Sequence, residues 1–263
     1  TGRTAMSNEL NVRKTAFVTG GGTGIGKGIA VSLAKSGYDV AILYRGSEEG
    51  ANDTLERIRH FGRKAAAIRA DVSKKSDIDN MFSEFANHFE RLDLFVNNAG
   101  ITLKSSFIET SEEIFDAVCS VDFKGAFFCM QNAAKFMIDK NIKGSIVLIS
   151  SNNAKAHFAD VSVYGSVKAA AQKMAEHAAI ELAKYGIRVN TVAPGWTDTG
   201  ASRLDDKEST YYKIPLKKWA SVDEVADAVK YLASHSARSV TGVTLTVDNG
   251  ALLVSDKRER YGY

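Results

Sequence analysis

The sequence predicts a single doubly wound α/β domain with about seven parallel strands and helices on both faces. Three observations support this: short apolar segments alternate with longer amphipathic ones, a glycine-rich turn follows the first apolar segment, and no linker interrupts the pattern. The chain has 263 residues, 44% of them hydrophobic, which is enough to enclose one large core. We therefore expect residues 14–263 to form one domain, preceded by a disordered or expression-derived segment, residues 1–13.

The predicted strands are short, rich in β-branched or aromatic residues, and apolar at consecutive positions, as is typical of strands buried on both faces of a parallel sheet. They are Thr15–Thr19, Val40–Tyr44, Ala65–Ala70, Leu92–Val96, Ser145–Ser150, Ile187–Val192 and Val243–Val247. The predicted helices between them are Ile25–Lys35, Glu48–Phe61, Ser76–Phe89, Glu112–Ile138, Tyr164–Tyr185 and Val222–Ser234. Repeated alternation of this kind predicts βαβ units with right-handed crossovers.

The turn between the first strand and the first helix contains five glycines in seven positions, with the spacing Gly20-x-x-x-Gly24-x-Gly26. A helix N-terminus presents unsatisfied N–H groups and a partial positive charge, and glycine lets the backbone approach a phosphate closely. We therefore expect the pyrophosphate of a dinucleotide here, in contact also with Thr23 and Ile25. A glycine-rich turn without a ligand is the alternative, and the spacing differs from the commoner G-x-G-x-x-G.

The end of the second predicted strand indicates which dinucleotide would bind. An acidic residue there accepts from the ribose 2′-hydroxyl, whereas an arginine accommodates a 2′-phosphate. This chain has Tyr44 followed by Arg45 and no carboxylate, which favours NADP, although NAD remains possible if Arg45 is only a solvated surface residue. Asp71 and Val72, after the third predicted strand, are placed to meet the adenine.

A second group of residues suggests proton transfer. Tyr164 and Lys168 are four residues apart at the start of a predicted helix, so their side chains share one face. Ser151 follows the fifth predicted strand. A lysine cation favours ionisation of a nearby phenol, and a serine hydroxyl can hold a substrate oxygen while charge develops on it. These three residues could exchange a proton with a carbonyl/alcohol pair; an ordinary helix face is the alternative.

With these motifs in order, the chain resembles the short-chain dehydrogenase/reductase family from about Lys14 to Leu252. The matching segments are "TGGGTGIG" from Thr19, "NNAG" from Asn97, Ser151 with "YGSVK" from Tyr164, and "APGWTDT" from Ala193. The resemblance implies a Rossmann-type fold, an NAD(P) cofactor and hydride transfer between a carbonyl and a secondary alcohol. It implies that Tyr164 is the general acid/base, that Lys168 also binds the nicotinamide ribose, and that Ser151 positions the substrate oxygen.

The resemblance also implies further cofactor contacts. Along the adenine ribose and the central strand these are Asn98, Ala99 and Gly100. At the nicotinamide half they are Pro194, Gly195, Thr197 and Thr199.

One position departs from the family pattern V-N-x-x-G. The segment reads "SVDFKGAF", with Asp122 where the family's asparagine helps to hold a water in the proton relay. Aspartate lacks the amide donor and can place a negative charge near Lys168, either as an ion pair or by offsetting the lysine's field. We expect Asp122 to act in catalysis with a shifted pH optimum. A dinucleotide-binding sensor or assembly subunit without catalysis is the alternative function.

Substrate contacts are expected at Ser151 and Tyr164 and also at Asn153, His157 and Trp196, although the histidine could be a plain loop residue and the tryptophan plain packing. The chain looks most like bacterial sugar or polyol dehydrogenases of the glucose 1-dehydrogenase type, with 3-oxoacyl-thioester reductases nearly as similar. The substrate is therefore expected to be a sugar, a polyol or a small ketone, and a 3-oxoacyl thioester is the alternative.

Composition excludes several other partners. A net charge of +3 without a basic patch argues against nucleic acid, and there is no apolar run long enough to cross a membrane. Two cysteines, Cys119 and Cys129, make no disulfide framework and suggest a cytoplasmic protein. No metal ligands are expected. The family resemblance implies a homotetramer, with the helices Glu112–Ile138 and Tyr164–Tyr185 as the usual dimer faces.

Overall fold

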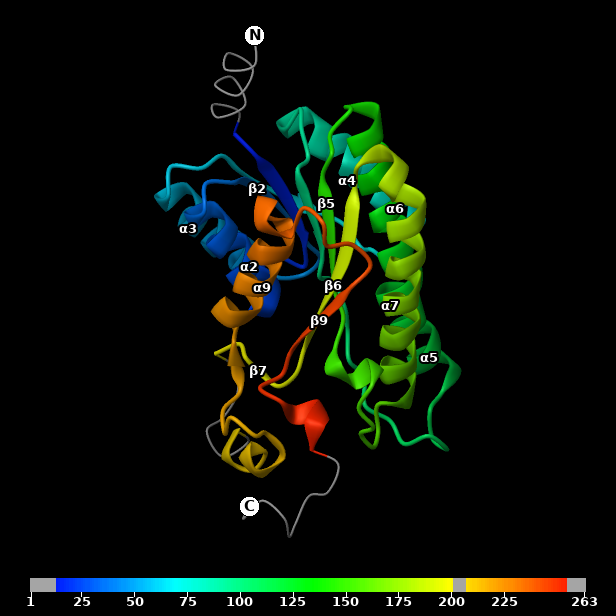
Figure 1. The fold of residues 1–263 in the computed structure, drawn as a ribbon. Coiled ribbons are helices and arrows are strands. Elements are labelled where there is room, and N and C mark those ends of the chain that lie inside the picture. The colour runs from blue at the N-terminus through cyan, green and yellow to red at the C-terminus, as the bar shows by residue number, and fades with distance from the viewer. Residues whose placement is uncertain (1–12, 201–206, 255–263) are drawn as a thin grey trace.

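The computed structural model describes residues 13–200 and 207–254, which contain one seven-stranded parallel sheet (Figure 1). Its strand order is β3-β2-β1-β4-β5-β6-β9. The strands are β1 (Thr15–Thr19), β2 (Asp39–Tyr44), β3 (Ala65–Arg69), β4 (Leu94–Asn97), β5 (Ser145–Ile149), β6 (Arg188–Pro194) and β9 (Thr244–Val247). The predicted fold class is thereby confirmed, and each predicted strand is present with ends that differ by no more than two residues.

Helices cover both faces of the sheet, as the alternating pattern predicted (Figure 1). On one face lie α2 (Gly24–Lys35), α3 (Glu48–His60) and α9 (Val222–Ala233). On the other face lie α4 (Lys75–His88), α6 (Ala126–Asp139) and α7 (Ser162–Leu182), with α5 (Glu112–Cys119) packed on α7. None of the helices within the described ranges is long and apolar enough to span a membrane.

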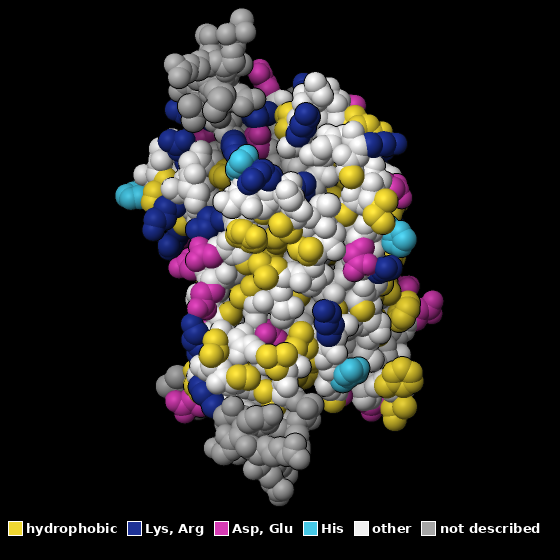
Figure 2. Space-filling view, in the orientation of Figure 1, with side chains coloured by type: hydrophobic (Ala, Val, Ile, Leu, Met, Phe, Trp, Pro, Cys, Tyr) yellow, Lys and Arg dark blue, Asp and Glu magenta, His cyan; other side chains and the backbone are white. Residues whose placement is uncertain are grey.

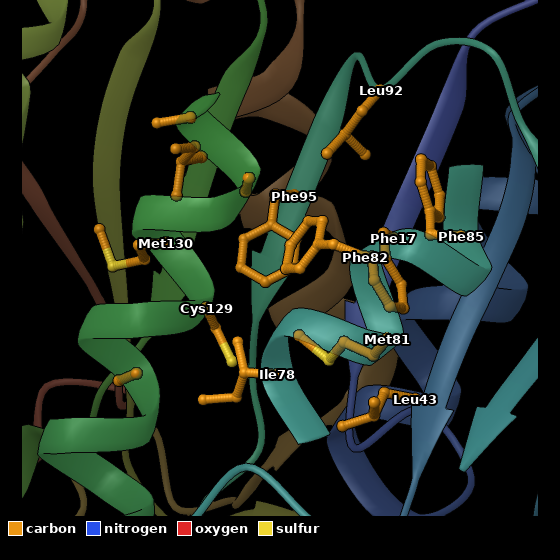
Figure 3. Close-up of a cluster of buried hydrophobic side chains, with 14 of the residues drawn as sticks. Phe17, Leu43, Ile78, Met81, Phe82, Phe85, Leu92, Phe95, Cys129 and Met130 are labelled. Carbon is orange, nitrogen blue, oxygen red and sulfur yellow. The ribbon is translucent and has the colours of Figure 1, made fainter. Parts of the chain in front are cut away.

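The core on the α4 side is built around an aromatic cluster (Figure 3). Phe17 of β1 stacks on Phe85 with ring centroids 5.0 Å apart and meets Phe82 and Phe95 edge-on at 5.6 and 5.8 Å. Each such ring contributes about 1.5–3 kcal/mol through burial of its apolar surface. This packing holds β1 and β4 rigidly against α4, so the loops at the ends of those strands have a fixed base.

The strand order reverses direction beside β1, because β2 and β3 extend to one side and β4, β5 and β6 to the other. Loops leaving β1 and β4 therefore separate, and they open a crevice at the carboxyl ends of the strands, where ligands bind in folds of this kind. Beyond β6, the predicted irregular stretch Gly195–Leu216 contributes a short strand, β7 (Thr197–Asp198), paired with β8 (Ala220–Ser221). Residues 201–206, the tail 255–263 and residues 1–12 of the predicted N-terminal segment lie outside the described ranges.

The prediction of one continuous helix over Glu112–Ile138 is wrong. A π-helical segment, η1 (Ser120–Gly125), separates α5 from α6. Here the chain passes so close to the loop after β3 that a methyl group on Gly125 would lie 2.5 Å from the Val72 carbonyl oxygen. The wider turn also directs Asp122 inward, where it is buried. Such π segments are frequent at functional sites.

Candidate active site

The glycine turn leaves the start of α2 open to a ligand. Gly20 and Gly24 have φ values of +67° and +53°, which side chains rarely tolerate. A methyl group on Gly26 would lie 2.2 Å from the Gly20 carbonyl oxygen. Thr23, the residue before the helix, makes no capping hydrogen bond with its side chain. The first N–H groups of α2 therefore keep their hydrogen-bonding capacity, which is what a bound phosphate requires.

Beside this turn lies a cavity of about 260 Å³. It joins the carboxyl ends of β1, β2, β3 and β4. The predicted cofactor residues in its wall are Gly20, Thr23, Tyr44, Arg45, Asp71, Val72, Ala99 and Gly100. Further lining residues that we did not predict include Gly22, Ser47, Ile101 and Val121. Ser47 could have been found from the sequence, because serine is a preferred residue directly before a helix. In the structure it caps α3 by accepting a hydrogen bond from the Gly50 N–H.

Arg45 stands at the rim of this cavity with 64% of its side chain exposed. Its Nη1 atom lies 4.0 Å from Asp71 Oδ2, at the outer limit of an ion pair. Asp71 Oδ1 already accepts hydrogen bonds from the Ser73 N–H and hydroxyl. The guanidinium therefore keeps most of its donors available at the end of β2.

The "NNAG" segment after β4 contributes structure as well as cavity wall. Asn98 donates from its amide to the Thr19 and Gly20 carbonyl oxygens at 2.9 and 3.4 Å. The Thr19 hydroxyl accepts from the N–H groups of Asn98 and Ala99, both at 2.9 Å. The side chain of Asn98 thus fixes the glycine turn and is not part of the cavity lining, whereas Ala99 and Gly100 are.

Tyr164 and Lys168 occupy the first two turns of α7, as their spacing required. Lys168 Nζ lies 5.5 Å from the centre of the Tyr164 ring, 3.1 Å from Asp122 Oδ2 and 3.4 Å from the Ile149 carbonyl oxygen. The side chains of Lys168 and Asp122 are 7% and 0% exposed. The cation is therefore held at a fixed place beside the tyrosine by a buried ion pair.

Asp122 also connects this ion pair to β4. Its Oδ1 atom accepts from the Ile101 N–H at 2.8 Å, whereas Oδ2 meets Lys168 only as an ion pair and makes no geometrically complete hydrogen bond. A methyl group on Gly100 would lie 3.0 Å from Asp122 Oδ2 and 3.2 Å from Lys168 Nζ. Gly100 thus lets the cofactor-side loop come into direct contact with the ion pair.

Ser151 lies buried just past β5, and its hydroxyl oxygen accepts from the Asn153 N–H at 3.1 Å. Gln172 holds this segment against α7, since its amide lies 3.0 Å from Ser150 Oγ and 3.4 Å from the Ser151 carbonyl oxygen. The Ser150 hydroxyl in turn donates to the Lys168 carbonyl oxygen. We did not predict Ser150 or Gln172, although a polar residue four positions after Lys168 on the same helix face is a usable signal.

Two of the other predicted substrate residues share a cavity that neither Ser151 nor Tyr164 lines. His157 and Trp196 line a cavity of about 300 Å³ that also includes Asn152, while Asn153 is not part of its lining. The Trp196 ring packs edge-on against Phe158, with centroids 5.2 Å apart.

The predicted nicotinamide-side residues follow the end of β6. Thr197 donates from its hydroxyl to the Gly195 carbonyl oxygen at 3.1 Å. Thr199 reaches the start of α2, where a methyl group on Gly24 would lie 3.7 Å from Thr199 Cγ2. Gly195 has no room for a side chain, because a methyl group would lie 2.6 Å from Asp248 Cβ. The segment from Pro194 therefore extends from the end of the sheet to the glycine turn before α2.

Comparison with known proteins agrees with this geometry. Residues 20–251 match a family model described as enoyl-(acyl carrier protein) reductase. The chain is 36% identical over 246 residues to 3-oxoacyl-(acyl-carrier-protein) reductase FabG of Staphylococcus aureus, covering 92% of this chain and 99% of the relative. It is also 36% identical over 251 residues to glucose 1-dehydrogenase 2 of Bacillus subtilis, covering 94% and 97%.

Among solved structures, a short chain dehydrogenase from Burkholderia cenocepacia in complex with NADP superposes with a TM-score of 0.84 at 34% identity, covering 90% of this chain and 97% of that one. The expected resemblance is thereby confirmed in sequence and in structure. The chain belongs to the short-chain dehydrogenase/reductase family and is an oxidoreductase.

Proposed function

We propose that this protein interconverts a carbonyl and a secondary alcohol, with NADP(H) as cofactor and Tyr164 as general acid/base. The observation that carries the proposal is that Lys168, 5.5 Å from the Tyr164 ring on α7, also adjoins Gly100 in the wall of the predicted cofactor cavity. Ser151 is held against the same helix, because the Gln172 amide lies 3.4 Å from its carbonyl oxygen. When bound there, the cofactor supplies or accepts the hydride. The residues of this chain supply the binding, the orientation and the proton.

In the reductive direction, the Ser151 hydroxyl donates a hydrogen bond to the substrate oxygen. Its oxygen already accepts from the Asn153 N–H, so the serine is oriented and its own proton is available. Tyr164 Oη then donates the proton that converts the developing alkoxide into an alcohol. Lys168, held by Asp122 and the Ile149 carbonyl oxygen, stabilises the phenolate that remains.

The cofactor is expected to contact the residues predicted for it, with its pyrophosphate on the turn from Gly20 to Gly26. β2 ends at Tyr44 and is followed by Arg45, so the strand itself supplies no carboxylate, and the exposed guanidinium meets Asp71 only at 4.0 Å. This arrangement supports the 2′-phosphate of NADP over NAD. Pro194, Gly195, Thr197 and Thr199 are proposed for the nicotinamide half.

Two substrate classes remain within the proposal. A sugar, polyol or small ketone fits the likeness to glucose 1-dehydrogenase 2, and a 3-oxoacyl thioester fits the likeness to FabG. A catalytically impaired sensor is the competing function, and only Asp122 favours it, because the other three reacting groups are present.

The test is turnover with a panel of ketones, sugars, polyols and 3-oxoacyl thioesters, followed through the absorbance of the reduced nicotinamide. Tyr164→Phe is the control, since it keeps the ring but removes the proton. Turnover in the wild type that is lost in this variant supports the enzyme. Tight NADPH binding with no turnover of any substrate would instead support the sensor.

We also propose a homotetramer with two kinds of interface. Phe107, Phe115 and Phe123 are exposed around a groove of about 640 Å³ between α5 and α7. Hydrophobic side chains also gather over β9, which pairs on one side only among the described strands (Figure 2). Two such faces suit a tetramer with dihedral symmetry. Light scattering should give the mass of a tetramer, and Phe115→Asp should give a smaller species.

We also propose a cytoplasmic location, because both cysteines are free thiols. Cys119 and Cys129 are both free thiols, and burial raises the pKa of the Cys129 thiol. Such cysteines suit a reducing compartment.

A further inference from the structure

We infer that the physiological substrate carries an anionic group, a carboxylate or a phosphate ester, which Lys155 and Lys213 bind in the cavity next to Ser151. This inference rests on the proposed function and specifies its substrate class. The cavity of about 300 Å³ begins at Asn152, the residue after Ser151, and ends at Trp196, which follows β6. Its wall therefore starts at the residue directly after the serine that would hold the reacting oxygen, and Ser151 itself is not among the lining residues.

Both lysines stand on ordered backbone. The Asn152 carbonyl oxygen accepts from the N–H groups of Lys155 and Ala156 at 2.9 and 2.8 Å, which closes a short helical turn. The N–H of Lys213 donates to the Thr210 carbonyl oxygen at 2.9 Å, within another turn. These turns place two lysines that are far apart in the chain in the lining of one cavity. The positive charge of the cavity therefore depends on the tertiary structure.

The cavity wall carries positive charge that no carboxylate in it compensates. The ten lining residues that the structure describes include the two lysines and His157, and none of these ten is acidic. Within residues 13–200 and 207–254, neither lysine makes an ion pair, although Lys213 Nζ lies 5.2 Å from the Tyr212 ring centre.

Two carboxylates of this part of the fold, Asp248 and Asp198, are already engaged. Asp248 lies behind the cavity, where its oxygens accept from the Gly250 and Leu252 N–H groups and approach the Asn152 amide at 3.5 Å. Asp198 is paired with Lys207 at 2.5 Å. Neither is among the lining residues, so an anion entering the cavity meets two lysines and, within residues 13–200 and 207–254, no carboxylate in its wall.

The apolar part of the wall limits the size of the occupant. Phe158 and Trp196 pack edge-on, and Leu252 and Val254 are further apolar residues of the lining. A volume of about 300 Å³ lies at the lower end of small-molecule sites, which favours a short substrate whose anionic end occupies this cavity.

Binding can be measured without turnover, because Trp196 lines the cavity and the chain has only one other tryptophan, Trp219. In a Trp219→Phe background, the complex with oxidised cofactor is titrated with two matched pairs of probes. One pair is 4-oxopentanoate and its neutral amide, and the other is dihydroxyacetone phosphate and dihydroxyacetone. We expect the anion of at least one pair to perturb Trp196 emission with a Kd about tenfold below that of its neutral partner.

The lysines are then tested with Lys155→Met, Lys213→Met and the double variant. Each single substitution should weaken the anion about tenfold and leave the neutral partner unchanged, and added salt should have the same selective effect. Lys184→Met is the matched control, since Lys184 also lies over a neighbouring tyrosine ring, at 5.1 Å, but before β6 at the other end of the sheet. Comparison of the two anions shows whether the group is a carboxylate or a phosphate.

The same pairs are assayed for turnover. A preference in kcat/KM for the anion that disappears in the double lysine variant supports the inference. Equal binding of anion and neutral partner, or equal weakening of both by the lysine substitutions, would overturn it. Turnover of neutral substrates that depends on Tyr164 would then leave the proposed function standing. Selective anion binding without any turnover would instead contradict the proposed function alone.

Discussion

Asp122→Asn restores the asparagine of the family pattern and removes one buried negative charge. Asn can still accept from the Ile101 N–H through Oδ1, so the link to β4 is retained. It cannot form the ion pair with Lys168, whose Nζ lies 3.1 Å from Asp122 Oδ2. The substitution therefore isolates the effect of the charge from the effect of the shape.

The expected magnitude follows from two distances. Lys168 Nζ is 3.1 Å from Asp122 Oδ2 and 5.5 Å from the Tyr164 ring centre, so Oδ2 lies within about 9 Å of that ring. A unit charge at that distance acts on another with about 2 kcal/mol at an effective dielectric constant of about 20. That energy corresponds to a displacement of about one pH unit in a proton-transfer profile.

The direction of the shift in the pH profile depends on which form of Tyr164 the Asp122 carboxylate disfavours. A carboxylate disfavours the phenolate, so its removal favours the phenolate and moves the profile of kcat against pH for alcohol oxidation to lower pH. The assay is oxidation of the best alcohol from the panel, measured from acid to alkaline pH at saturating cofactor. An unchanged profile would refute the reasoning, because it would mean that the lysine field at Tyr164 does not depend on Asp122.

Stability provides a second readout. Loss of the partner leaves a buried lysine without its counter-charge, and we expect the free energy of unfolding to fall by about 3 kcal/mol. Asp39→Asn is the matched control, since Asp39 is also buried and accepts from a backbone N–H, that of Lys64, at 2.8 Å. It should leave the pH profile where it is.

Three further predictions test other parts of the site. Arg45→Glu should weaken NADPH binding about tenfold or more and leave the affinity for NADH nearly unchanged, as measured by cofactor fluorescence. An unchanged ratio of the two affinities would contradict the role proposed for the arginine. Gly26→Ala should prevent cofactor binding and lower Tm, because its methyl group would lie 2.2 Å from the Gly20 carbonyl oxygen. Gly46→Ala is the control for stability and should leave Tm nearly unchanged, because open space surrounds that position. Gln172→Leu should lower kcat about tenfold with little change in cofactor affinity, because the amide fixes the segment of Ser151 and does not line the cofactor cavity. Partial rescue of kcat by Gln172→Glu would show that the residue positions Ser151 and does not only fill space.

The local features of the site could be read from the sequence because their geometry depends on residues close together in the chain. The glycine turn that we propose for phosphate needs only a strand, a run of glycines and a helix start. Tyr164 and Lys168 share a face because they are four residues apart on one helix. Buried parallel strands give consecutive apolar positions, so the sheet was predictable to within a residue or two at most strand ends.

The orientation of the Asn98 side chain and the π segment could not be predicted from the sequence. A motif identifies Asn98 but not the direction of its amide, which the structure turns onto the Thr19 and Gly20 carbonyl oxygens. The helical period of residues 112–138 is unbroken in sequence, and the break at Ser120–Gly125 arises where Gly125 contacts the loop after β3. Both outcomes depend on neighbours that are remote in the chain.

The sequence by itself therefore determined the fold class, because periodicity specifies the strands and helices, and its motifs identified the family. It predicted the glycine turn as a phosphate site and Ser151, Tyr164 and Lys168 as the reacting group, and the family resemblance supplied their roles. Only the tertiary structure decided that Asp122 pairs with Lys168 and that Lys155 and Lys213 face one cavity. The physical reason is that charges act over a few ångströms of space. Which charges come that close depends on how loops from different strands pack, and no local pattern in the sequence encodes that packing.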